Sequence, residues 1–154
     1  MKRLLLIAAL LLAAAPVLAK DMPYNTKADA KAEVAHALSE AKVNHKPVLL
    51  FFGANWCPDC RALAKSVKHG KNAKLLARHF NIVKIDVGQF DHNTNIAKRF
   101  GNPIKGGIPA AVIVSPQGKV MFSTKAGQLA NARHMSDQGV YGFFEKAIKD
   151  SHAG

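Results

Sequence analysis

The feature that most constrains the fold of this chain is an apolar run over residues 48–52, bounded by Pro47 and Gly53. The run has the length of a β-strand, and its Val, Leu and Phe side chains are apolar at every position. Such a segment has no face suited to water, so it is typical of a central strand covered on both sides of a sheet. The chain has 154 residues, enough for one domain with a core of its own.

Helical and strand-like patterns alternate around this run. Val34, Leu38 and Ala41 form one apolar stripe and predict a first helix over residues 27–44. Further helices are expected over residues 61–68, 72–79, 92–100 and 136–148, and further strands over 82–87, 110–114 and 119–123. This order predicts an α/β fold in which a parallel βαβ unit is extended by an antiparallel hairpin. The result is a central mixed four-stranded sheet flanked by helices.

The beginning of the chain has the pattern of a secretory signal. Lys2 and Arg3 form a short basic start, an apolar run follows over residues 4–15, and small residues end it at Ala19. We therefore expect residues 1–19 to be a cleaved signal peptide and the mature protein to be secreted or periplasmic, where disulfides persist. The run is short for a membrane span, so no stable span is expected after cleavage. An uncleaved N-terminal anchor is the alternative.

The rest of the chain is expected to form one domain that is preceded by a short lead-in segment. Residues 20–26 contain Pro and Asn and no periodic pattern, so they are expected to form a flexible lead-in to a single domain over residues 27–150. The formal net charge is +12, which favours acidic partners or anionic surfaces. Because the Lys and Arg residues are scattered and form no long basic run, a solvated basic surface is expected and nucleic-acid binding is not.

The two cysteines of the chain, Cys57 and Cys60, follow the apolar run closely. A disulfide between them would close a very small loop, which removes little entropy from the unfolded chain and stabilises the fold weakly. Pro58 suits the first turn of a helix, where its missing N–H is no loss. The spacing therefore favours chemistry over a structural staple.

Three segments together resemble the thioredoxin superfamily: the strand over 48–52, the motif Trp-Cys-Pro-Asp-Cys over 56–60, and Gly-Ile-Pro over 107–109 before the hairpin. The resemblance covers about residues 28–148 and is closest to exported thioredoxin-like disulfide isomerase or interchange proteins. It implies a thioredoxin-like fold and a cis peptide bond before Pro109, which faces the cysteine pair. It also implies that Ile108 and Pro109 bind substrate and that the protein needs no cofactor beyond its redox-active disulfide. The alternative role for Pro109 is to shape a tight turn.

The chemistry expected of the pair is thiol–disulfide exchange. At a helix start, unpaired N–H groups and the helix dipole stabilise a thiolate, so the pKa of Cys57 should lie below the ordinary value of about 8.5. The Cys57 thiolate would attack a substrate disulfide to form a mixed disulfide, which Cys60 would then resolve. The sequence thus predicts an exported disulfide reductase or isomerase whose substrates are protein thiols and disulfides, with a redox partner that recycles the pair.

The residues that flank the cysteines are expected to tune this chemistry. Asp59 places a negative charge beside the thiolate and should oppose the lowering of its pKa, which favours a reducing or isomerising pair over a strong oxidant. The alternative is that Asp59 points to water and does little. Together with Asp59, Pro58 is expected to tune the properties of the cysteine pair. Trp56 is expected to flank the site as a contact surface for substrate, or else to be a half-buried packing residue.

The sequence departs from the thioredoxin pattern in two places. Thioredoxins have a buried carboxylate six residues before the first cysteine, and Phe51, which cannot move a proton, stands at that position here. Asp86, at the end of a neighbouring strand, is a candidate substitute, although a strand-end Asp is more often a turn residue. The loop between Phe100 and Ile108 is about three residues longer than the pattern, and it adjoins the expected cis-proline, where it would alter substrate choice.

Two other classes of function remain open alongside exchange chemistry. Cysteines at this spacing also bind copper, as in an exported metallochaperone, and a non-catalytic thioredoxin-like binding module would carry an idle disulfide. A structural zinc site needs four ligands, and the seven histidines show no matching spacing, so no metal ligands are expected. Haem attachment would need His directly after the second cysteine, where Arg61 stands.

Overall fold

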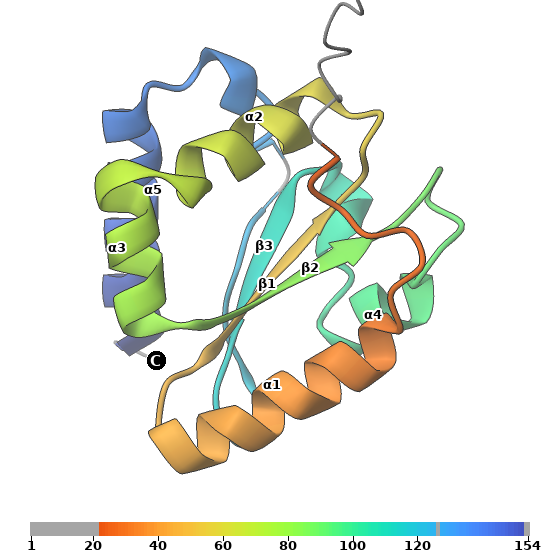
Figure 1. The fold of residues 1–154 in the computed structure, drawn as a ribbon, viewed down its shortest axis with the longest axis vertical. Helices are drawn as coiled ribbons and strands as arrows, with labels where there is room; N and C mark the ends of the chain where they lie inside the picture. The colour runs from red at the N-terminus through yellow and green to blue at the C-terminus, as the bar shows by residue number, and fades with distance from the viewer. Residues whose placement is uncertain (1–21, 126, 153–154) are drawn as a thin grey trace, which may run out of the picture.

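The computed structural model describes residues 22–125 and 127–152. The expected signal peptide, residues 1–19, lies outside the described residues. In chain order the elements are α1 Ala30–Asn44, β1 Val48–Gly53, α2 Pro58–Lys68, α3 Gly70–His79, β2 Asn81–Asp86, α4 Thr94–Arg99, η1 Pro103–Gly106, β3 Ala110–Val114, β4 Val120–Ser123, η2 Ala132–His134 and α5 Asp137–His152. Helices lie on both sides of the sheet, with α1 and α4 on one side and α2, α3 and α5 on the other (Figure 1).

In the described part of the chain the strands form one four-stranded mixed sheet in the order β2-β1-β3-β4. β1 pairs in parallel with β2, so that Gly53 lies opposite Asp86, and antiparallel with β3. β3 and β4 form the antiparallel hairpin. The expected α/β fold with a central mixed sheet is therefore confirmed.

β1 is the covered central strand that its apolar sequence predicts, because every one of its residues is buried. Its side chains alternate between the two layers of the core. Leu50 and Phe52 pack with α1 and α4, whereas Leu49 and Phe51 pack with α2, α3 and α5. The strand is thus held on both faces and along both edges, which fixes the position of its last residue.

The predicted elements all exist, and the differences lie at their ends. The first helix begins at Ala30 and not at residue 27, because Asp29 caps it by accepting the backbone N–H of Ala32 at 3.0 Å. The helix expected over 72–79 begins earlier, at Gly70. β4 begins one residue later than expected, at Val120.

One residue of the expected lead-in, Tyr24, is packed onto the domain. Tyr24 is only 3% exposed and belongs to the core layer of α1. Its backbone is held by Asn55: the Tyr24 N–H donates to Asn55 Oδ1 at 3.0 Å, and Asn55 Nδ2 donates to the Tyr24 carbonyl at 2.7 Å. The sequence did not predict this packing of Tyr24, because a single aromatic residue in a polar stretch produces no periodic pattern.

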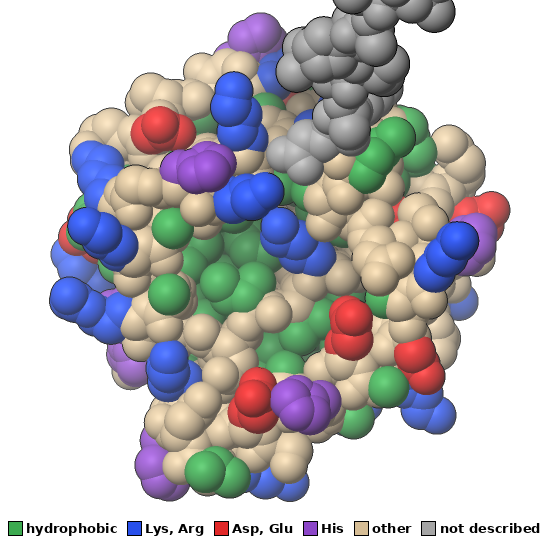
Figure 2. All heavy atoms as spheres, in the orientation of Figure 1, with side chains coloured by type: hydrophobic (Ala, Val, Ile, Leu, Met, Phe, Trp, Pro, Cys, Tyr) green, Lys and Arg blue, Asp and Glu red, His purple; other side chains and the backbone are tan. Residues whose placement is uncertain are grey.

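Charged side chains are spread over the surface, as their scattered positions in the sequence predict. On the visible face, Lys and Arg side chains lie around a central apolar area, with His among them and fewer Asp and Glu (Figure 2). Among the described residues, no helix combines the length and the apolar character needed to cross a membrane.

The packing of Tyr24 can be tested at Gly53. A Cβ added to Gly53 would overlap the Tyr24 ring, so Gly53→Ala should lower the free energy of unfolding by about 1–3 kcal/mol in urea denaturation. In a Tyr24→Ala background the same substitution should have a smaller effect, because the ring is gone. The matched control is Gly142→Ala in α5, where no atom lies within 4 Å of the new Cβ and stability should not fall. Equal stability of Gly53→Ala and the parent would contradict the packing.

Candidate functional site

The site lies where β1 ends and α2 begins. A short connection from Gly53 carries Asn55 and Trp56 and brings the chain to Cys57, the residue that caps α2. Pro58 occupies the first turn of α2, where a missing N–H leaves no hydrogen bond unmade. The start of this helix is therefore set by local sequence, and its position by the buried strand.

Cys57 and Cys60 are joined by a disulfide, with their Cα atoms 5.2 Å apart. Cys57 is 4% exposed and Cys60 is fully buried. The backbone N–H of Cys60 donates to Cys57 Sγ at 3.1 Å, so this sulfur takes the place of a capping oxygen at the helix start. A negative charge on Cys57 would be stabilised there by the same N–H and by the helix dipole.

Residues far along the chain face this sulfur from the loop before β3. The Ile108–Pro109 peptide bond is cis, as the resemblance implies, and both residues are buried. The carbonyl oxygen of Ile108 lies 3.8 Å from Cys57 Sγ. The structure therefore brings Ile108 and Pro109 against the cysteine pair, and their part in substrate binding stays a prediction.

Trp56 lies at the surface beside the pair, with 47% of its area exposed. Its indole Nε1–H donates to the carbonyl of Gly88 at 2.7 Å, which fixes the ring against the loop after β2. Its ring also meets that of Phe90 edge to face, with centroids 6.3 Å apart. Trp56 thus has one packed side and one side open to a partner.

Asp59 does not point to water. It is 8% exposed, its Oδ1 accepts the backbone N–H of Arg133 at 3.0 Å, and its Oδ2 lies 3.8 Å from the Arg133 guanidinium. The carboxylate therefore joins α2 to η2, and the arginine charge offsets part of its field at the sulfur. Since Arg133 is half exposed, the ion pair itself contributes little to stability.

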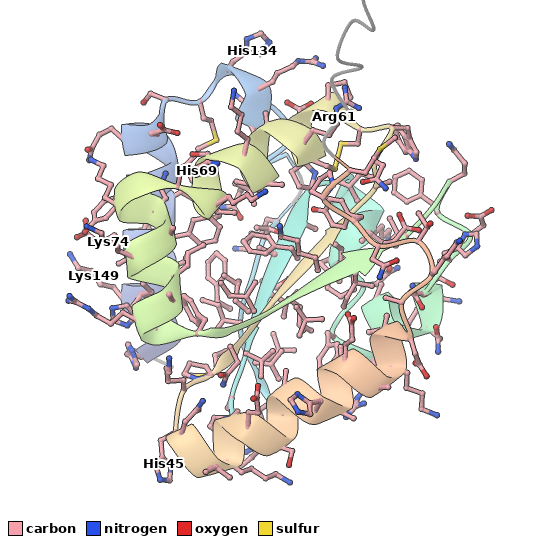
Figure 3. The ribbon with its side chains drawn as sticks, in the orientation of Figure 1. His45, Arg61, His69, Lys74, His134 and Lys149 are labelled. Carbon is pink, nitrogen blue, oxygen red and sulfur yellow. A yellow bond between two sulfur atoms is a disulfide. The ribbon has the colours of Figure 1, made fainter. Side chains whose placement is uncertain are left out.

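A second arginine lies at the same end of α2. Arg61 Nη1 donates to the Asn55 carbonyl at 2.6 Å, which holds its charge beside the connection that carries Trp56. Figure 3 shows Arg61 near the start of α2, at the end of the molecule that also holds the disulfide. Two arginines, from α2 and from η2, thus adjoin the cysteine pair.

Phe51, which departs from the thioredoxin pattern, and Asp86, the candidate substitute for its missing carboxylate, both have structural contacts. Phe51 is 2% exposed, and its ring meets that of Phe144 edge to face at 5.7 Å, so an apolar contact stands at the position of the carboxylate. Asp86 is buried, accepts the Gly88 N–H at 3.2 Å and receives Asn93 Nδ2 on its carbonyl at 2.8 Å. Those contacts give Asp86 the role of a turn residue, which was the alternative to its role as a substitute carboxylate.

Two groups near the site have shifted pKa values. Burial, and next the charge of Asp86, raise the pKa of the Tyr24 hydroxyl well above its ordinary range. The hydrogen bond with His92, and next the N–H of Gln89, lower the pKa of Asp91. Tyr24 is therefore neutral and Asp91 is ionised at neutral pH.

The sequence did not reveal four residues that shape the site: Asn55, Arg61, Phe90 and Arg133. Asn55 and Arg61 directly flank the cysteine motif in the sequence, and this proximity is the only signal that could have marked them as site residues. Arg133 meets Asp59 across 74 residues of sequence, and no local pattern marks it. Nothing in the sequence around Phe90 distinguishes it from other loop residues, and only the structure shows its contact with Trp56.

A large cavity lies elsewhere in the described part of the chain. It has a volume of about 770 Å³ and lies between α1 and the edge strand β2, with Ala32, Glu33, Ile82 and Val83 in its walls. None of its lining residues contacts the cysteine pair. A smaller cavity of about 230 Å³ adjoins Trp56 and the loop after β2. Within the described ranges, no group of three or more His, Cys, Asp or Glu is placed to hold a metal.

The fold and the site define a class of protein. It is an α/β domain with a disulfide at the start of a helix and a cis-proline loop that faces the sulfur of the first cysteine, Cys57. A family model described as Thioredoxin-like matches residues 29–116. The chain belongs to the thioredoxin-like family, so the resemblance seen in the sequence is confirmed.

Two curated proteins are similar to parts of the chain. Disulfide bond reductase DsbH of Chlamydia pneumoniae is 29% identical over 92 residues, which are 55% of this chain and 55% of the chlamydial protein. Probable nucleoredoxin 1 of Arabidopsis thaliana is 31% identical over 126 residues, 70% of this chain and 21% of the plant protein. The chain therefore spans about half the length of the first relative and about a fifth of the second.

Solved structures extend the comparison. The crystal structure of a disulphide isomerase from Xylella fastidiosa Temecula1 is 56% identical, with a TM-score of 0.80 over 82% of this chain and 96% of that one. The oxidised C-terminal domain of DsbD from Neisseria meningitidis is 22% identical, with a TM-score of 0.56 over 78% of this chain and 97% of that one. The second likeness shows the fold alone.

The effect of Asp59 on the sulfur can be measured. Asp59→Asn keeps an oxygen for the Arg133 N–H but removes the charge, so the pKa of Cys57 in the reduced protein should fall. The pH profile of Cys57 alkylation by iodoacetamide should move to lower pH, and stability should change by less than about 1 kcal/mol. Asp150→Asn is the control, because Asp150 pairs with Lys146 on α5 and should leave the profile in place. An unmoved profile for Asp59→Asn would show that its charge does not reach the sulfur.

Proposed function

We propose that this protein is an exported thiol–disulfide oxidoreductase that reduces or isomerises disulfides in protein substrates through Cys57 and Cys60. The observation that carries the proposal is the geometry of Cys57 Sγ. It caps α2, accepts the Cys60 N–H at 3.1 Å, forms a disulfide with Cys60 and lies 3.8 Å from the Ile108 carbonyl. Similarity to a solved structure described as a disulphide isomerase supports the same reading.

In the reduced protein, the Cys57 thiolate would attack one sulfur of a substrate disulfide. The substrate disulfide bond breaks, a mixed disulfide forms, and the first substrate sulfur leaves as a thiolate. Cys60 then attacks Cys57 Sγ, which restores the Cys57–Cys60 bond and releases the second substrate sulfur. Two electrons pass from the cysteine pair to the substrate, and a partner dithiol must return them before the next cycle.

Burial divides the work between the two cysteines. Cys57 keeps 4% of its area exposed and can meet a substrate, whereas Cys60 is fully buried and can meet only Cys57. Since Phe51 offers no proton acceptor, the Cys60 proton would pass to the departing substrate thiolate or to water. The chemistry needs no cofactor, because the reduced cysteine pair itself supplies the two electrons.

A substrate chain would approach past the Ile108 backbone, whose carbonyl faces Cys57 Sγ, and across Trp56. Isomerisation uses the same first step, since the mixed disulfide can be attacked by another substrate thiol before Cys60 resolves it. Export to the periplasm or beyond rests on the signal pattern of residues 1–19, and it would place the protein where protein disulfides are available.

Single cysteine variants test the two roles. Cys57→Ser should reduce the rate of insulin disulfide reduction by about a hundredfold or more, because the nucleophile is gone. Cys60→Ser should still attack but should accumulate the mixed disulfide, seen as a mass increase under non-reducing conditions. Intact exchange in Cys57→Ser would overturn the assignment of the nucleophile. Stoichiometric copper binding without exchange by the parent protein would favour the metallochaperone instead.

The direction of the reaction can be read from the redox potential. Equilibration with glutathione buffers should place the Cys57–Cys60 couple nearer the value of about −270 mV typical of a reducing thioredoxin than the value of about −120 mV of a strong oxidant. The reason is that Asp59 adds negative charge near the thiolate and so favours the disulfide. A couple at the oxidising end would contradict the proposed reduction and isomerisation.

A further inference from the structure

The loop between β2 and α4, residues 87–93, carries an aromatic residue in an unfavourable setting. Phe90 has a φ of +64°, a left-handed conformation that bulky side chains rarely adopt. Its side chain is also 44% exposed, so burial does little to offset that conformation. Backbone strain at an exposed aromatic residue is a reason to look for a function.

Hydrogen bonds hold this loop in one shape. The carboxylate of Asp86 accepts the Gly88 N–H at 3.2 Å, and that of Asp91 accepts the Gln89 N–H at 2.8 Å. The Asp91 N–H reaches back to the carbonyl of Val87 at 3.2 Å. Gly88 has a φ of +54°, and a Cβ there would collide with the Asp91 carboxylate, so the tight path needs glycine. Phe90 is therefore presented by a built loop.

The loop presents Phe90 to the residue that precedes the outer cysteine. The rings of Phe90 and Trp56 meet at an angle of 62° with centroids 6.3 Å apart, an edge-to-face contact. The indole N–H of Trp56 is already bonded to Gly88, so the pair offers ring surface and no indole donor to a partner. With 47% and 44% of their areas exposed, the two rings form an apolar ledge beside Cys57.

We propose that Phe90 is a specificity-determining residue, and that the Phe90–Trp56 ledge binds a large apolar side chain next to the reacting cysteine of a polypeptide substrate. The occupant follows from the position of the ledge. A substrate sulfur bonded to Cys57 brings its neighbouring side chains over Trp56, and the ledge continues from there to Phe90. Covering the two rings removes apolar area from water, which favours aromatic or large aliphatic side chains over polar ones. This inference rests on the proposed exchange activity.

The test compares two synthetic peptide disulfides that differ only in Phe or Ser next to the cysteine. The parent protein should show a higher kcat/KM for the Phe peptide. Phe90→Asn removes the ring with a residue that tolerates left-handed backbone, and it should reduce the Phe-to-Ser preference by about fivefold to tenfold. Phe90→Leu keeps an apolar side chain and should give an intermediate preference. Val43→Asn, at an exposed apolar position of α1, should leave the preference unchanged.

Binding can be followed apart from the reaction. Trp56 is the one tryptophan in the sequence, so intrinsic fluorescence reports on the ledge directly. A redox-inert peptide, with Ser replacing the cysteine and Phe beside it, should change this fluorescence in the parent protein, and much less in Phe90→Asn. The matching peptide with Ser beside it should have little effect on either protein.

The outcomes separate this inference from the activity on which it rests. Failure of the parent protein to reduce either peptide would contradict the proposed function. Reduction of both peptides with no preference, or with a preference that Phe90→Asn retains, would overturn the role of Phe90 while leaving the activity in place. A concentration-dependent dimer of the parent in sedimentation, absent in Phe90→Asn, would show that the ledge covers a second copy and would also overturn it. If Phe90→Asn does not fold, the preference of Phe90→Leu decides.

Discussion

The hydrogen bond from the Cys60 N–H to Cys57 Sγ depends on where β1 ends. Every residue of β1 is buried, with helices on both faces and a paired strand on each side, so its last residue cannot shift without disturbing the core. The short connection then delivers Cys57 to the start of α2, where backbone N–H groups have no partner within the helix. A sulfur placed there can carry negative charge at low free-energy cost. The position of Cys57 is therefore a consequence of a fully buried central strand.

Segments from distant parts of the chain converge on this helix start. Ile108 arrives from the loop before β3, which pairs with β1, and its carbonyl faces the outer sulfur. Arg133 arrives from η2 and binds Asp59, which ties down the first turn of α2 and partly neutralises the nearest carboxylate. Tyr24 packs against Gly53, the last residue of β1. The chemistry is thus buried and held rigidly, while only one sulfur remains within reach of a partner.

In the proposed function, residues other than the cysteines provide the surface that contacts a substrate. Trp56 and Phe90 are exposed, and their positions are fixed by hydrogen bonds to the loop and within it, so they are ordered before any partner binds. Preorganised apolar surface binds without the loss of side-chain freedom that a flexible residue would suffer. Two arginines near the pair add positive charge to a chain that is already basic. In the proposed function, the cysteines carry out the exchange, and the surrounding surface selects the substrate.

The sequence by itself determined the features that depend on neighbouring residues. The central strand followed from its apolar run, and the pairing of Cys57 with Cys60 followed from a spacing that places both on one helical turn. The element boundaries moved by a few residues, because caps such as Asp29 decide them. Tertiary structure alone decided that Tyr24 is buried, that Asp59 meets Arg133 across 74 residues, and that Phe90 lies against Trp56. These contacts join segments that share no local pattern, so only the packed chain brings them together.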